Sequence, residues 1–168
     1  MPLCYQRRML SALVLVPHGS APNATAQVVR SLAALVPLVV EGLVRDVVLM
    51  GPTAAEWQGI ADHGGCRLAE SMAQALALAR GPWVFVLQAG FAPNAGFAEE
   101  VSDFMALGTG AAMLRAHPTG FFTRLFPDSA ALAGIILSAQ GHSGTCLADL
   151  AKNAAPRQTM ATRARRVG

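Results

Sequence analysis

The side chains that could bind a metal lie in two short histidine–cysteine segments. His63 precedes Cys66 by three residues, and His142 precedes Cys146 by four. These spacings occur among zinc ligands, but a complete site would need the two distant segments to meet. An odd number of cysteines in an intracellular protein is more typical of free thiols. We therefore expect Cys4, Cys66 and Cys146 to be reduced, and no zinc site.

The polar stretch QGHSGT at 140–145 contains a possible serine nucleophile, Ser143. A nucleophile loop of the hydrolase type needs glycine two residues after the serine, where Thr145 stands. It also needs a histidine later in the chain, and none follows His142. A hydrolase or thiol enzyme using these residues is an alternative, but a polar loop is the simpler interpretation.

Short apolar runs alternating with helical patterns predict an α/β fold. The runs expected to form strands are 12–16, 46–50, 66–69, 83–87, 111–116 and 134–139. Apolar spacing of three and four residues predicts helices at 23–36, 54–63, 72–80, 97–107 and 147–153. Pro37 is expected to end the first helix or to begin a short second one, and Arg80 to close the third helix. This alternation is typical of a mostly parallel sheet covered by helices on both faces.

Ligands of such sheets bind at the carboxyl ends of the strands. The pattern places these ends at 17–21, 50–53, 69–71 and 88–91. Neither G-x-G-x-x-G after the first strand nor G-x-x-x-x-G-K-[ST] occurs anywhere, so the phosphate loops of dinucleotide folds and P-loop enzymes are missing.

The residues that frame these strand ends resemble a glycosyltransferase of family 2 with the GT-A fold. The resemblance covers about 12–107 and includes Pro17-His18, ADHGG at 61–65 and ARGPW at 79–83. It implies a Rossmann-like GT-A three-layer sandwich, with a shortened acceptor half. It also implies that a vestigial nucleotide-sugar cleft is formed by Pro17, His18, Gly19, Met50, Gly51, Gln88, Ala89 and Gly90.

The sequence differs from the family at the positions that would bind the metal ion and the nucleotide. The resemblance implies an Asp-x-Asp motif holding Mg²⁺ or Mn²⁺, a base-binding aspartate after the second strand, and a Gly/Arg-rich loop after the third. Gln88-Ala89-Gly90, Met50-Gly51 and Glu70-Ser71-Met72 stand in these places. Carboxylates are the usual ligands of such cations. We therefore expect no cofactor and no catalytic residue, and a binding or accessory role.

An active, metal-independent transferase using a nucleotide-sugar donor is the alternative. Arg67 and Arg80 are the basic residues that stand near strand ends in the sequence, and they would have to meet the diphosphate. A test also follows from the resemblance: two carboxylates introduced at 88 and 90 are expected to restore binding of a divalent ion.

Charge is distributed unevenly along the chain. There are 13 basic and 10 acidic residues, and five of the basic ones lie in 152–168. The slightly acidic body argues against nucleic acid as a partner. We expect one domain over 1–151 and a frayed, solvated basic tail over 152–168, which could touch an anionic membrane surface.

Apolar residues make up 53% of the chain, but no run is long enough to predict a membrane-spanning helix. With no leader-like segment recognised, a cytoplasmic location is expected. A homodimer is also expected, through an apolar surface formed by late phenylalanines: Phe91, Phe97, Phe121, Phe122 and Phe126.

Overall fold

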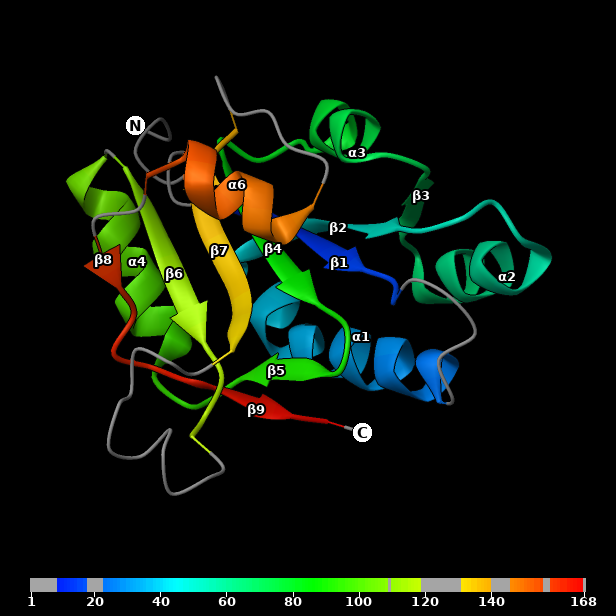
Figure 1. The fold of residues 1–168 in the computed structure, drawn as a ribbon, viewed down its shortest axis with the longest axis horizontal. Helices are drawn as coiled ribbons and strands as arrows, with labels where there is room; N and C mark the ends of the chain where they lie inside the picture. The colour runs from blue at the N-terminus through cyan, green and yellow to red at the C-terminus, as the bar shows by residue number, and fades with distance from the viewer. Residues whose placement is uncertain are drawn as a thin grey trace.

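The fold is a central sheet between two layers of helices (Figure 1). The computed structural model describes residues 9–17, 23–108, 110–118, 131–139, 146–155 and 158–167. The main sheet contains β1 (Leu10–Leu15), β2 (Val44–Met50), β3 (Arg67–Ala69), β4 (Trp83–Gln88), β6 (Ala111–Arg115), β7 (Leu132–Ser138) and β8 (Gln158–Thr159). The helices are α1 (Ala24–Val40), α2 (Ala55–Gly64), α3 (Met72–Leu78), α4 (Phe97–Leu107) and α6 (Leu147–Asn153). A second, two-stranded sheet pairs β5 (Phe91–Pro93) with β9 (Ala164–Arg166).

The strand order of the main sheet is β3-β2-β1-β4-β7-β6-β8. β1 pairs in parallel with β2 and β4, and β2 pairs in parallel with β3. β7 runs antiparallel to both of its neighbours, β4 and β6. The predicted mostly parallel α/β sandwich is confirmed, and this arrangement is consistent with a Rossmann-like GT-A fold.

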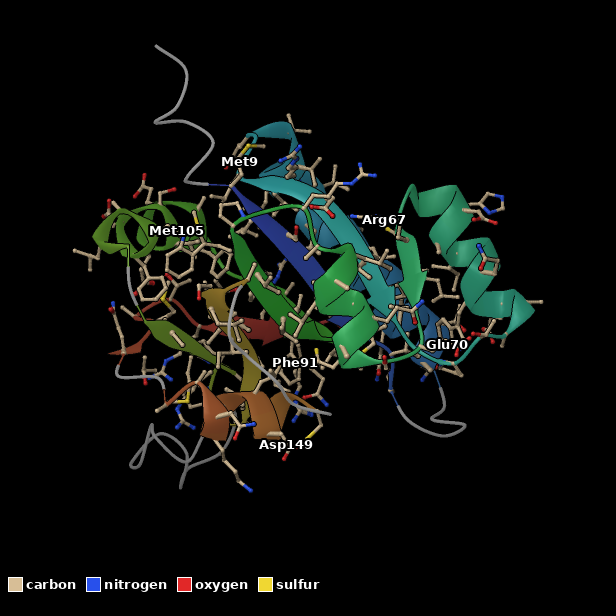
Figure 2. The ribbon with its side chains drawn as sticks, turned by 90° about the horizontal axis from the view of Figure 1, so that it is seen from above. Met9, Arg67, Glu70, Phe91, Met105 and Asp149 are labelled. Carbon is tan, nitrogen blue, oxygen red and sulfur yellow. The ribbon has the colours of Figure 1, made fainter. Side chains whose placement is uncertain are left out.

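Alternating side chains of the strands form two separate cores. On β1, Leu10, Ala12 and Val14 pack in the core beneath α1, α2 and α4, whereas Leu13 and Leu15 pack in the core beneath α3 and α6. Both faces of the sheet are therefore covered, which explains why the strands are continuous apolar runs rather than alternating ones. Figure 2 shows Met105 on α4 and Arg67 on β3 at opposite sides of the molecule.

The prediction that Pro37 ends the first helix is wrong, because α1 continues through it to Val40. Pro37 lies on the exposed side of the helix. There the carbonyl that loses its usual N–H partner can be solvated, which reduces the cost of an interior proline. Leu38 then contributes to the core, one turn beyond Leu35.

The prediction of a frayed, solvated tail is wrong for residues 158–167. β8 adds to the edge of the main sheet beside β6, and β9 pairs antiparallel with β5. Met160 and Ala164 are buried in the larger core. The segment is therefore held by backbone pairing and apolar contacts, even though two of the three residues of β9 are arginines.

None of the helices in the described part of the chain has the length and apolar character needed to cross a bilayer.

Candidate functional site at the carboxyl edge of the sheet

The parallel strands bring most of the predicted site residues to one edge. Leu15 lies opposite both Met50 on β2 and Gln88 on β4. The ladder continues past the strands, because the Val16 amide donates to the Met50 carbonyl (2.8 Å) and the Ala89 amide donates to the Leu15 carbonyl (3.0 Å). Pro17 follows at this edge, while His18 and Gly19 lie outside the described residues.

The end of β2 is apolar and tightly packed. Met50 is only 6% exposed and belongs to the core on the α3 side of the sheet. A Cβ placed on Gly51 would come within 2.7 Å of Val16 Cγ2, so Gly51 lets the ends of β1 and β2 approach each other. No acidic side chain lies on the stretch from Met50 to Thr53.

The turn after β4 is fixed by hydrogen bonds from two sides. Ser31, fully buried on α1, accepts from the Gly90 amide (3.0 Å) and donates to the Phe91 carbonyl (2.8 Å). From the other side, the Val167 amide donates to the Gly90 carbonyl (2.8 Å). Gly90 has a φ of +89°, in the left-handed region that favours glycine. The backbone of this turn is therefore held in a conformation that suits glycine and not an acid.

Side chains at positions 88 and 90 do not converge. Gln88 is exposed and, in register with Leu15, lies on the α3 and α6 face of the sheet. A Cβ at position 90 would instead meet the Gln27 side chain of α1 at 3.4 Å. Ala89, between them, is 5% exposed and packs in the core on the α1 side.

The residues at the end of β4 do not fit a divalent cation. Gln88 offers a neutral amide, Ala89 is buried, and Gly90 has no side chain. In the described ranges no three His, Cys, Asp or Glu side chains lie close enough to hold a metal ion. Mg²⁺ and Mn²⁺ require several oxygen ligands, some of them charged, and this turn supplies none of the charge.

The acidic residues near this edge accept hydrogen bonds from threonine side chains. Glu70 accepts a hydrogen bond from Thr53 across the ends of β2 and β3. Glu56, in the first turn of α2, accepts one from Thr25 in the first turn of α1. Figure 2 shows Glu70 on the side of the molecule that carries α2, away from Asp149 on α6.

The Arg166 side chain reaches this edge from a distant part of the sequence. β9 lies beside β5 directly after the Gly90 turn (Figure 1), and Arg166 pairs in register with Phe91. The Arg166 guanidinium carbon is 5.6 Å from the centre of the Phe91 ring, a cation–π contact. The sequence offered no local signal for this placement, because it depends on pairing between strands that are far apart in the chain.

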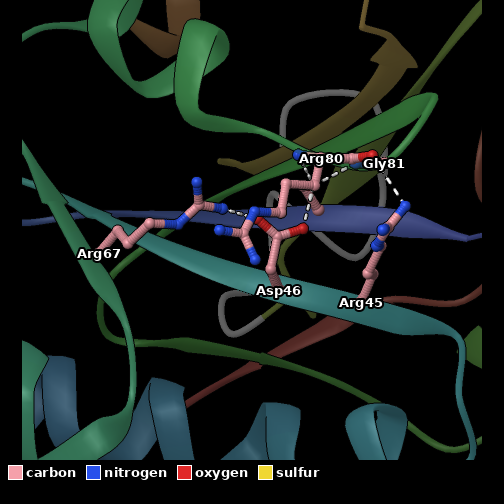
Figure 3. Close-up of polar contacts among 6 residues, drawn as sticks. Arg45, Asp46, Arg67, Arg80 and Gly81 are labelled. Carbon is pink, nitrogen blue, oxygen red and sulfur yellow. Dashed lines mark hydrogen bonds and ion pairs between the residues drawn. The ribbon is translucent and has the colours of Figure 1, made fainter.

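Arg67 and Arg80, in contrast, make their polar contacts at the opposite edge of the sheet (Figure 3). Arg67 forms an ion pair with Asp46. The Arg80 amide donates to the buried Ser11 hydroxyl (3.0 Å), and its carbonyl accepts from Arg45 Nη1 (3.3 Å). α3 ends at Leu78, so Arg80 does not close that helix as the sequence had suggested. The Arg67 side chain and the Arg80 backbone therefore make their contacts near the amino ends of the parallel strands.

Glu100 anchors the segment that leads into β9. Its carboxylate accepts from the amides of Ala161 (2.5 Å) and Thr162 (2.8 Å). Burial by itself would raise the pKa of Glu100, but hydrogen bonds from the Thr162 side chain and from both amides hold the pKa below its ordinary value. The charged carboxylate is thus favoured in the folded protein.

Because the pKa of Glu100 is lowered in the folded protein, its carboxylate stabilises the fold at pH values above the unfolded-state pKa of about 4.3. This contribution is lost as the pH falls through the lower native pKa. We expect the Glu100→Gln variant to lose less stability on acidification than the parent does. The urea midpoint measured between neutral and acidic pH checks this. Glu99→Gln, on the exposed neighbouring residue, should retain the parent's pH dependence, and parallel curves for Glu100→Gln and the parent would contradict the anchoring role.

The histidine–cysteine pairs do not form a metal site among the described residues. The His63 ring nitrogen Nδ1 lies 2.6 Å from the Gly59 carbonyl, one turn back on α2. Cys66 and Cys146 are free thiols, as predicted, and burial raises the pKa of the Cys66 thiol. His142 and Cys4 lie outside the described residues.

No protein-family model and no curated protein sequence matches the chain. Among solved structures, the chain is similar to glucosyl-3-phosphoglycerate synthase from Mycobacterium tuberculosis, determined in complex with Mg²⁺ and uridine diphosphate. The sequence identity is 19% and the TM-score is 0.46. The match covers 79% of this chain and 57% of that structure, so the chain spans little more than half of that protein's length.

Proposed function

We propose that this chain is a glycosyltransferase family 2-like domain that has lost metal-dependent transfer and acts as a binding or accessory domain. The observation that carries the proposal is the turn after β4. In the family that the sequence resembles, this place holds the carboxylates that bind the cation. Here the turn is neutral, and Gly90 has a φ of +89°.

Hydrogen bonding supports the view that the turn has a structural role of its own. Ser31 and Val167 together satisfy the Gly90 amide, the Gly90 carbonyl and the Phe91 carbonyl. A backbone fixed on both sides cannot easily rearrange to bring two side chains onto one cation. The apolar end of β2, where Met50 is buried, lacks the base-binding acid as well.

A second candidate function is supported by the position of β9. Arg165 and Arg166 lie on the strand that pairs with the segment after the turn, and both are exposed. Guanidinium groups bind phosphates through paired N–H donors and require no metal. Arg166 packs over Phe91, whereas Arg165 lines the groove between α1 and α4, because successive side chains of a strand point to opposite faces. A nucleoside diphosphate contacting Arg166 is the form that a metal-independent binding site, or an active metal-independent transferase, would take. Arg67 and Arg80 do not suit this phosphate-binding role, because they make their contacts at the opposite edge of the sheet.

The two candidates are distinguished by thermal unfolding with UDP or GDP, each with EDTA and with Mn²⁺. For the proposed domain without metal chemistry we expect no Mn²⁺-dependent rise in Tm. A nucleotide at a free concentration of about 100 times its Kd would stabilise the folded protein by about 2.7 kcal/mol, which thermal unfolding can detect. A rise that occurs in EDTA and is lost in Arg165→Ala/Arg166→Ala supports the second candidate.

The control for this measurement is Arg45→Ala, at the opposite edge of the sheet, which should leave any nucleotide response unchanged. A Tm that rises only when Mn²⁺ and nucleotide are both present would overturn the proposal. Transfer of sugar from a nucleotide-sugar donor, measured as release of the nucleoside diphosphate, would overturn the accessory role.

A further inference from the structure

The outward face of α1 is an apolar surface with no partner in the described structure. Val29, Val36, Val39 and Val40 are 47%, 55%, 43% and 81% exposed. Val28, Leu35 and Leu38 bury the opposite side of the helix. A helix that is apolar on its outer face as well as on its core face is typical of one that is covered. We call the surface of these four valines the α1 ridge.

The α1 ridge stands between two grooves. One, of about 650 Å³, lies between α1 and α2 and is lined by Val29, Val36 and Val39 among others. The other, of about 590 Å³, separates α1 from the start of α4 and from β9. Arg30 and Glu41 of the α1 segment line this second groove, together with Arg165 of β9, so the two α1 charges lie along the same side of the ridge.

The expectation of an interface formed by phenylalanines is wrong for the two that the structure describes. Phe91 and Phe97 are 8% and 1% exposed and belong to the core. Phe121, Phe122 and Phe126 lie outside the described residues. Among the residues that the structure describes, four of the five large exposed apolar side chains lie on α1.

We propose that the α1 ridge binds a second copy of this chain, with the two α1 helices antiparallel about a two-fold axis. The argument for a second copy is the charge pattern beside the ridge. Arg30 and Glu41 are the charged residues of the segment 24–41, and they have opposite sign. A two-fold axis makes each surface meet itself, so the two charges must complement each other across it.

The positions of the two charges fit this symmetry. Arg30 and Glu41 are equally far along the chain from the midpoint between Leu35 and Val36. They are about three helical turns apart, so they project from the same side of α1. An antiparallel contact centred at this midpoint places each Arg30 beside Glu41 of the partner subunit. It also places Val36 close to the axis and Val29 near Val40 of the partner subunit.

The apolar ridge and the flanking charges have different roles in this contact. Burial of the valines drives association, and their side chains can enter the groove beside the partner's helix. Each rim ion pair adds little energy but sets the orientation of the two copies. A parallel arrangement would instead place like charges side by side.

The first test is sedimentation equilibrium of the protein over a wide concentration range. We expect reversible monomer–dimer association of the parent. Val36→Glu should weaken it at least about 100-fold, because two carboxylates would meet near the axis without partners. Leu107→Glu, at an exposed apolar residue on α4 that is 73% exposed, is the matched control and should not change association. Circular dichroism verifies that both variants are folded.

The second test reverses the charges. Arg30→Glu and Glu41→Arg should each weaken the dimer by about tenfold, and the double variant should restore it. A parent that stays monomeric at all concentrations overturns the proposal, as does a Val36→Glu variant that associates like the parent. A double variant that remains as weak as the single variants overturns the antiparallel register. None of these results depends on nucleotide binding at the carboxyl edge.

Discussion

Ser11→Ala is expected to lower the free energy of unfolding by about 2–4 kcal/mol, because it leaves buried backbone N–H groups without a partner. The Ser11 hydroxyl is fully buried and makes three hydrogen bonds. It accepts from the amides of Arg80 (3.0 Å) and Gly81 (2.8 Å) and donates to Asp46 Oδ1 (2.5 Å). A hydroxyl can donate one hydrogen bond and accept two, so the Ser11 hydroxyl makes every hydrogen bond available to it.

Water cannot easily replace the lost hydroxyl, since the chain is tightly packed there. A Cβ on Gly81 would lie 2.8 Å from the Ser11 amide nitrogen, so the two backbones are in close contact. Urea unfolding measures the effect. Ser102→Ala is the control, because the Ser102 hydroxyl only donates to the Ala98 carbonyl within α4 and its loss should cost less than about 0.5 kcal/mol. A loss for Ser11→Ala below about 1 kcal/mol would show that the network is not a main support of the fold.

The second large effect is expected for the variant that returns carboxylates to the end of β4. Gln88→Asp/Gly90→Asp should lose about 2–3 kcal/mol of stability, nearly all of it from position 90. An aspartate there would have to adopt a φ near +89°, and its Cβ would contact the Gln27 side chain at 3.4 Å. Gln88→Asp alone is exposed and should change stability by less than about 0.5 kcal/mol.

The same double variant should gain no stability from Mn²⁺. The family resemblance alone predicted restored metal binding, but the structure places side chains at 88 and 90 on different faces of the sheet. Thermal unfolding with and without Mn²⁺ decides between the two expectations. Gly110→Asp, where φ is +98° and the surrounding space is open, measures the backbone cost alone and should lose about 1 kcal/mol. A Mn²⁺-dependent rise in the Tm of the double variant would mean that the two carboxylates do meet.

Most elements between residues 10 and 107 could be predicted because their signals are local. Apolar runs ended by Gly or Pro identify β1, β2 and β4, and the helix over Phe97–Leu107 was predicted to the residue. β5 and β9 could not be found in the same way. Each has three residues, one contains Pro93 and the other two arginines, so neither resembles a strand until the other lies beside it.

The positions of the strand ends could be predicted from the sequence, but the arrangement of the side chains there could not. Parallel pairing brings Met50 and Gln88 level with Leu15, as expected for the carboxyl ends of parallel strands. The side-chain directions at 88 and 90 depend on a left-handed glycine and on Ser31, which lies on a different element. The alternative role of Arg67 and Arg80 at a diphosphate depended on their positions in the sequence, but Asp46 pairs with the Arg67 side chain and Ser11 binds the Arg80 backbone amide at the other edge.

The Ser11 network and the Gly90 turn lie at opposite ends of the same strands, about 13 Å apart along β1 at 3.3 Å per residue. Substitutions separated by this distance, with no shared partner, act almost independently on stability. Substitutions at exposed positions of the carboxyl edge, such as Gln88, therefore leave the Ser11 network intact, and Ser11, Asp46 and Gly81 keep the strands aligned. In evolutionary terms, exposed side chains at the carboxyl edge can vary at no cost to the amino edge, whereas the Gly90 turn is constrained by its own backbone conformation.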